Sequence, residues 1–129
     1  MPQFDYPVTI DGDVGVLTAS GEVDLAAGPA LRAGLDGLVR GGQQHLIVDL
    51  RQVTFLDSVG LGVLVAACKR LRDRDPPGSL RLAGANDRVV KVFELTGLLG
   101  IFPMYATVDQ ARAAADNHAA GPSSQPATS

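Results

Sequence analysis

The sequence contains few of the residues on which common chemical sites depend. Cys68 is its single cysteine, His45 and His118 are its histidines, and tryptophan is absent. One cysteine permits neither an intrachain disulfide nor a cysteine cluster for a metal, so we expect Cys68 to pack in the core of a cytoplasmic protein. Aromatic residues make up 5% of the chain, which argues against a stacking platform for nucleic-acid bases.

Charge and hydropathy exclude further classes. The formal net charge of -3 argues against direct nucleic-acid binding, because phosphate neutralisation needs a clustered excess of Lys and Arg. The longest apolar run, residues 59–68, is far shorter than the roughly 20 residues that span a bilayer. Residues 1–6 lack the pattern of a secretory signal. With no phosphate-binding loop and no metal-ligand spacing, we predict no membrane partner, no cofactor and no metal.

The remaining composition is that of one globular domain. Hydrophobic residues are 46% of 129, enough to bury a core. We assign residues 1–116 to this domain. Residues 117–129 are rich in Ala, Ser and Pro and lack apolar periodicity, so they are predicted to form a disordered tail.

Local patterns predict alternating strands and helices. Apolar residues alternate on both sides of Asp11-Gly12, which is typical of a β-hairpin. Helical spacing and end signals then predict helices beginning at Gly28-Pro29, Ser58, Asn86 or Asp87, and Thr107, separated by strands at 45–50, 80–83 and 104–105. Leu31, Leu35 and Leu38 of the first helix and Thr96 of the third are expected to face inward. The last helix is expected to open with a capping box of Thr107 and Gln110 and to end near Ala115. Together they predict an α/β fold, a mixed β-sheet with an N-terminal antiparallel hairpin and about five strands and four helices.

The most informative position is Ser58, which follows a buried strand and begins a helix. We expect Ser58 to be the N-cap, a role worth about 1 kcal/mol. The same helix end favours a phosphate group, through its free N–H groups and its dipole. Open α/β sheets place their sites at the carboxyl ends of strands. Asp57 adjoins Ser58 there, and Asp24 ends the preceding strand and is expected at the same edge.

Two glycines in the first turns of this helix need an explanation. Gly60 and Gly62 each cost about 1 kcal/mol relative to alanine in a helix. Either another backbone approaches them closely, or they pack tightly against the first helix or the sheet. Spacing alone does not separate these two explanations.

Two catalytic interpretations fit the sequence poorly. A serine hydrolase would require the glycine pattern of a nucleophile elbow, but position 56 is leucine, and neither histidine is placed to act as a base. An aspartyl phosphorelay receiver would require an acidic pair for magnesium after an early strand, whereas Asp24 stands alone beside Glu22 across Val23. We therefore predict no catalytic residues and no enzymatic activity.

Three segments resemble the STAS domains, and within them the stand-alone anti-sigma factor antagonists. They are residues 20–26, 48–62 and 93–103, in the family's order, and the resemblance covers nearly all of residues 4–115. It implies a STAS-like fold and phosphorylation of Ser58 by the anti-sigma factor, itself a serine kinase. The partner-binding surface is then assigned to Asp24, Asp57, Ser58, Val59, Gly60 and Gly62. Val59 departs from the family, which more often has Ser, Thr or Ala there.

The resemblance also implies a partner-switching cycle. The unmodified protein binds the anti-sigma factor and thereby frees a sigma factor. The phosphorylated protein dissociates from the anti-sigma factor. A phosphoserine phosphatase resets the cycle, and ATP belongs to the kinase. The alternative is a STAS scaffold or ligand-sensing module without sigma-factor switching, which the valine at position 59 keeps open.

Overall fold

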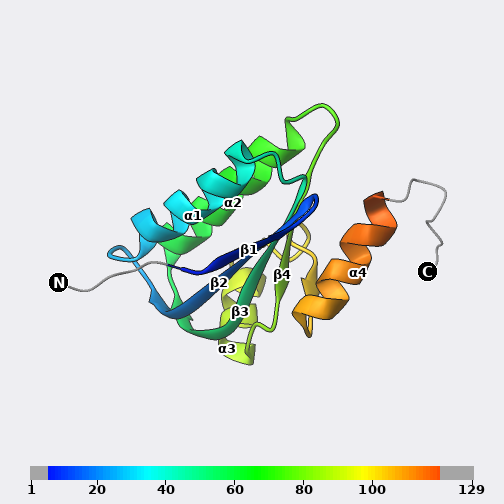
Figure 1. The fold of residues 1–129 in the computed structure, drawn as a ribbon. Helices are drawn as coiled ribbons and strands as arrows, with labels where there is room; N and C mark the ends of the chain where they lie inside the picture. Colours follow the sequence, from blue (N-terminus) through cyan, green and yellow to red (C-terminus); the bar gives the residue numbers. More distant parts are fainter. Residues whose placement is uncertain (1–5, 120–129) are drawn as a thin grey trace.

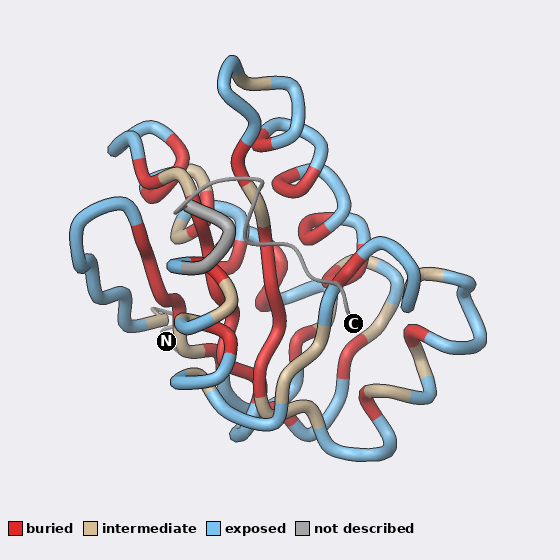
Figure 2. Tube along the Cα trace, turned by 90° about the vertical axis from the view of Figure 1, so that its right-hand side faces the viewer, coloured by how far each residue is buried: buried red, intermediate tan, exposed pale blue. Residues whose placement is uncertain are grey.

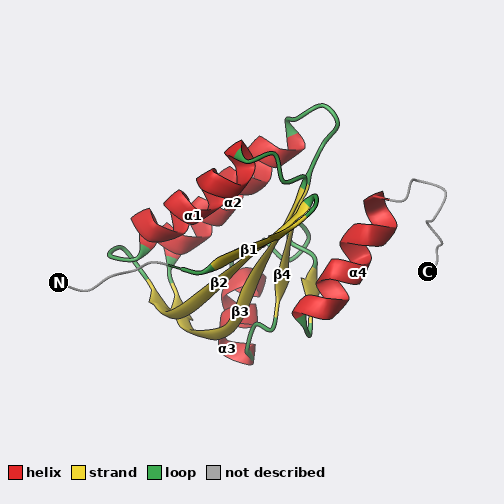
Figure 3. Ribbon diagram, viewed as in Figure 1, coloured by secondary structure: helices red, strands yellow, loops and turns green. Residues whose placement is uncertain are grey.

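The structure is a computed structural model in which residues 6–119 are described, with side chains described through residue 116. Strands and helices alternate after an opening hairpin (Figures 1 and 3). In chain order the elements are β1 (Val8–Asp11), β2 (Val14–Val23), α1 (Gly28–Arg40), β3 (His45–Leu56), α2 (Ser58–Arg72), β4 (Ser79–Ala83), α3 (Asp87–Leu95), β5 (Met104–Tyr105) and α4 (Val108–Ala119). The predicted α/β architecture is confirmed.

The strands form one mixed sheet in the order β1-β2-β3-β4-β5. β1 and β2 are antiparallel, and every later neighbouring pair is parallel. Val23 at the end of β2 pairs with Leu56 at the end of β3. The segments that follow these two strands therefore leave the sheet at the same edge.

Helices cover both faces of the sheet. α1 and α2 lie side by side on one face, and α4 lies on the other (Figure 1). The larger core contains Leu31, Leu35 and Leu38 of α1, as predicted, together with α2, α3 and the central strands. A smaller cluster packs Ala111 and Ala115 of α4 on the opposite face. The central strands are buried along most of their length (Figure 2).

β3 is twice as long as the strand predicted from residues 45–50. Its first six residues are buried, whereas the last six are buried only at Val53 and Leu56. Pairing with β4 stops at Asp49, and the remainder of β3 pairs with β2 alone. Exposed residues are tolerated there because one side of the strand has no neighbouring strand. A hydropathy pattern therefore does not identify the second half of β3 as a strand.

The third and fourth helices differ from expectation at their ends. Asn86 caps α3 by accepting from the Val89 N–H at 2.9 Å, and Thr96, predicted to face inward, is an exposed residue beyond the last turn. Thr107 accepts from the Gln110 N–H at 3.1 Å, half of the predicted capping box. α4 continues to Ala119, so residues 117–119 of the predicted tail are helical, and residues 120–129 lie outside the described residues. No helix of the described part is both long and apolar enough to span a membrane.

Candidate functional site

The side chain that caps α2 is Asp57, not Ser58 as predicted. The Asp57 backbone is extended, and its Oδ1 accepts from the N–H of Val59 at 2.9 Å and of Gly60 at 3.2 Å. Aspartate and serine are comparable N-caps, and a carboxylate also complements the positive end of the helix dipole. Because β3 ends at Leu56, the one residue between strand and helix takes the cap, and Ser58 becomes the first helical residue.

Ser58 is exposed, and its side chain forms no hydrogen bond that stabilises the described part of the chain. Its hydroxyl makes no hydrogen bond to any described residue, although Asp57 and Val59 on either side are half-buried. An exposed hydroxyl without a partner can be modified without disturbing the fold. Sequence analysis therefore located this residue correctly but gave it the wrong local role.

Asp24 lies beside Asp57 at the same edge of the sheet, as predicted. The Asp57 N–H donates to the carbonyl of Val23 at 3.2 Å and so joins the two segments. Asp24 Oδ1 accepts from the N–H groups of Ala26 at 3.1 Å and Ala27 at 3.3 Å. Both carboxylates therefore hold the turns that lead into α1 and α2, and they bring two negative charges close to Ser58.

Tyr6 is a neighbour of Asp24 that sequence analysis missed. Its hydroxyl oxygen is buried and has no hydrogen-bond partner within residues 6–116. Burial, and secondarily the Asp24 carboxylate, raises the pKa of this phenol, so Tyr6 remains neutral at physiological pH. Alternation of apolar residues suggested a strand here, but β1 begins at Val8.

The two glycines of α2 have different explanations. A Cβ on Gly60 would lie 2.5 Å from Leu56 Cδ1 and 3.2 Å from the carbonyl oxygen of Val23, so this glycine permits close packing of the helix on the sheet. A Cβ on Gly62 would meet nothing within 4 Å, and the residue is exposed. Packing within the domain thus accounts for Gly60 but leaves Gly62 without a structural reason.

Val59 points toward the start of α1. A Cβ on Gly28 would lie 2.8 Å from Val59 Cγ1. The absence of a side chain at position 28 therefore makes room for the valine, whose bulk is directed between the helices.

Two large apolar side chains are exposed in the segments that border the site. Leu25, next to Asp24, is 73% exposed, and Phe55, near the end of β3, is 46% exposed. Phe55 also lines a shallow cleft of about 310 Å³ with Glu22, Thr54 and Arg88. Neither residue was predicted, because an isolated apolar residue in a polar segment gives no sequence signal of exposure. Apolar surface beside a polar group is typical of a protein-binding site.

His45 is not placed to act as a base for Ser58. His45 begins β3, and its Nδ1 lies 2.7 Å from Ser79 Oγ, at the opposite end of the strand from Ser58. The side chain of His118 lies outside the described residues. Within residues 6–116, no group of three or more His, Cys, Asp or Glu side chains is arranged to hold a metal ion.

Comparison with known proteins identifies the family. The STAS domain family model matches residues 5–111. The chain belongs to the STAS domain family. The sheet order and helix placement described above are accordingly those of a STAS domain.

Relatives of this STAS domain are named anti-sigma factor antagonists. The anti-sigma-B factor antagonist of Bacillus subtilis is 35% identical over 96 residues, which are 74% of this chain and 84% of that protein. The crystal structure of an anti-sigma factor antagonist from Mycobacterium paratuberculosis superposes with a TM-score of 0.78 at 32% identity, covering 86% of this chain and 92% of that one. The structure of the anti-sigma factor antagonist SpoIIAA in its unphosphorylated form gives 0.71 at 25% identity, covering 83% and 92%.

Proposed function

We propose that this STAS domain is an anti-sigma factor antagonist, controlled by phosphorylation of Ser58. In this proposal the unphosphorylated protein binds an anti-sigma factor that is also a serine kinase, and so releases a sigma factor. Phosphorylation of Ser58 abolishes that binding, and a phosphoserine phosphatase restores it. The observation that carries the proposal is the exposed Ser58 hydroxyl, free of hydrogen bonds to the described residues and placed at the start of α2.

The charge around Ser58 supports a switch of this kind. A phosphate would add about -1.5 to -2 charges at neutral pH. The N–H groups of Val59 and Gly60 already bond to Asp57, so they are not free to neutralise it. A partner packed on this surface would have to bury the new charge beside Asp57 and Asp24. A loss of about 3 kcal/mol would weaken binding more than a hundredfold, without a large conformational change.

The surface beside Ser58 supports binding of a protein. Leu25 and Phe55 provide exposed apolar area, and Gly62 lies one helical turn from Ser58 with open space above it. Gly62 lowers the stability of the helix and is not required by packing within the domain. Close approach of a partner's backbone would explain why this position is a glycine. Asp24 and Asp57 fix the two turns that present this surface.

In this proposal the chain has a regulatory role in the cytoplasm rather than an enzymatic one. Serine, two carboxylates and no nearby histidine within the described residues make a modifiable docking surface, not an acid–base pair. ATP enters the scheme as the substrate of the kinase. Neither nucleic acid nor a membrane is part of it.

The direct test is phosphorylation by the anti-sigma factor kinases of the same organism. Each purified kinase is incubated with the chain and Mg-ATP, and the product is weighed by intact mass spectrometry. We expect one phosphate on the wild-type chain and on Ser20→Ala, a control at another exposed serine, and none on Ser58→Ala. Ser58→Ala should still bind the kinase, whereas Ser58→Asp should bind poorly. Phosphate addition elsewhere, or to no residue with any of the kinases, would favour a STAS scaffold or ligand sensor instead.

A further inference from the structure

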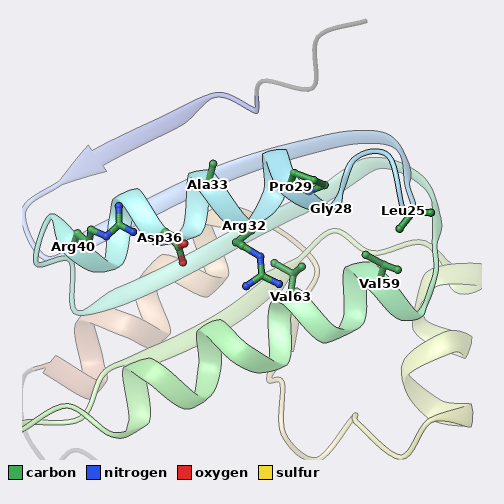
Figure 4. A pocket seen from close by; sticks show the side chains of 9 residues that line it. All are labelled: Leu25, Gly28, Pro29, Arg32, Ala33, Asp36, Arg40, Val59 and Val63. Atoms are coloured by element: carbon green, nitrogen blue, oxygen red, sulfur yellow. The ribbon is translucent and has the colours of Figure 1, made fainter.

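A groove between α1 and α2 opens beside Ser58. It has a volume of about 470 Å³. Its apolar part is formed by Leu25, Pro29, Val59 and Val63, and Arg32 and Arg40 of α1 add charge (Figure 4). The Arg32 side chain extends across the groove toward α2 near Val63 (Figure 4). The groove is therefore apolar in its floor and basic along the α1 side.

The positive charge of the groove is uncompensated. Asp36, the acidic residue of the lining, is paired with Arg70 of α2. Arg32 and Arg40 are exposed, and neither forms an ion pair with any residue of the described part. The whole chain has a formal net charge of -3, so this basic strip is a local feature of an otherwise acidic protein. It complements an occupant with negative charges.

The groove is continuous with the proposed partner-binding surface. Val59 follows Ser58 and lines the groove, and Leu25 follows Asp24 and lines its mouth. A protein that contacts Ser58 and Asp24 therefore reaches the groove without leaving the surface of the domain.

We propose that the groove binds an acidic amphipathic helix of the anti-sigma factor kinase, an inference that rests on the function proposed above. Grooves with an apolar floor commonly accept the apolar face of a helix. Arg32 and Arg40 are eight residues apart on α1, about 12 Å along its axis. Carboxylates two turns apart on the bound helix, at positions i and i+7 or i+8, face them. Apolar side chains next to the carboxylate that faces Arg32 contact Pro29, Ala33 and Val63.

This surface supplies a second docking point beyond the phosphorylated one. Binding at Ser58 is lost when the serine is modified, but the groove contains no modified residue. It contributes affinity and selects the kinase by charge, because complementary charges accelerate association and suppress wrong partners.

The test uses the kinase that the Ser58 assay identifies, with the full chain. Titration calorimetry measures the dissociation constant for wild type, for R32E/R40E and for A33W, which fills the groove from an exposed helical position. We expect at least a tenfold weakening for both variants, and a smaller one for R32Q/R40Q, which avoids repulsion with Asp36. The control K69E/R72E carries the same charge change near a different cleft of α2 and should bind within about twofold of wild type.

A photo-crosslinker at position 33 then identifies the occupant. The expected product joins residue 33 to a helical segment of the kinase with the predicted acidic spacing. Unchanged affinity of R32E/R40E and A33W would overturn the inference while leaving phosphorylation of Ser58 intact. A crosslink to a second copy of this chain, or to a segment without acidic residues, would overturn it too. If no kinase binds or modifies the chain, the proposed function itself fails, and the inference fails with it.

Discussion

The polar side chains where β3 begins and those around Ser58, where β3 ends, form different kinds of hydrogen bonds. At the edge where β3 begins, they join separate elements: Arg74 donates to the backbone carbonyls of Val39 and Gln43, and Gln44 donates to that of Pro76. At the edge where β3 ends, Asp24 and Asp57 bond only to N–H groups two or three residues away. At that edge Asn86 Nδ2 also donates to the Val53 carbonyl at 3.2 Å, but the side-chain bonds around Ser58 itself are local and leave its hydroxyl unbonded to the described residues.

This contrast predicts that residues at one edge determine the stability of the domain and that residues at the other determine its binding to a partner. A substitution at the edge where β3 begins removes bonds between elements and should lower the free energy of unfolding without affecting partner binding. A substitution on the exposed part of the Ser58 edge should do the reverse.

Gly60→Val should destabilise the domain most. Its Cβ would lie 2.5 Å from Leu56 Cδ1 and close to the Val23 backbone, and overpacking of this kind costs about 1–3 kcal/mol. Urea denaturation measures the loss. Gly62→Val, in open space on the same helix, is the control and should lose much less; equal losses would show that the packing difference between the two glycines is not real.

Arg74→Met should destabilise by about 1.5–2 kcal/mol, since the hydrogen bonds from a charged donor to the backbone carbonyls of Val39 and Gln43 are lost. Arg72→Met, at an exposed neighbour without an ion pair among the described residues, should leave stability within about 0.5 kcal/mol. Kinase binding should be unchanged in both. If Arg74→Met is fully folded but binds the kinase more weakly than wild type, residues where β3 begins also contribute to binding, which would contradict the proposed separation of stability from interaction.

Asp57→Ala should cost about 1 kcal/mol of stability, because it removes the cap of α2. Asp57→Asn retains a capping oxygen and should restore most of that stability. Thermal unfolding compares the two variants. If Asn is as damaging as Ala, the negative charge rather than the hydrogen bonds of Asp57 stabilises the helix.

Gly62→Ala should raise stability by up to about 1 kcal/mol and weaken binding of the kinase. Gly37→Ala provides a matched control, because Gly37 is also an exposed helical glycine with open space around it. It should give a similar gain in stability with no change in binding. A Gly62→Ala variant that binds as well as wild type would remove the close approach of a partner backbone from the account.

Sequence alone predicted the fold well because its signals are local. The hairpin turn, predicted at Asp11-Gly12 and formed one residue later by Gly12-Asp13, the leucines of α1 and the cap at Asn86 each lie within a few residues of what they determine. The second half of β3 was missed since it pairs on one side only, and the inward position of Thr96 was wrong because the helix ends before it.

The site was predicted in part. Ser58, Asp57 and Asp24 were placed at one edge of the sheet because strand order and the carboxyl-end rule determine that position. Whether Asp57 or Ser58 caps α2 depends on the residue at which β3 ends. A one-residue difference in that end makes Asp57 the cap instead of the predicted Ser58. The groove could not be predicted, since its lining joins α1 with α2 and depends on their packing. The different environments of Gly60 and Gly62 also required the structure.

The most direct measurement is the affinity of the cognate kinase for two samples of this chain, one unmodified and one stoichiometrically phosphorylated at Ser58. Calorimetric titration in the absence of ATP hydrolysis gives both dissociation constants under the same conditions. The account predicts binding by the unmodified chain and at least a hundredfold weaker binding after phosphorylation, equivalent to about 3 kcal/mol. Equal affinity of the two samples would contradict it.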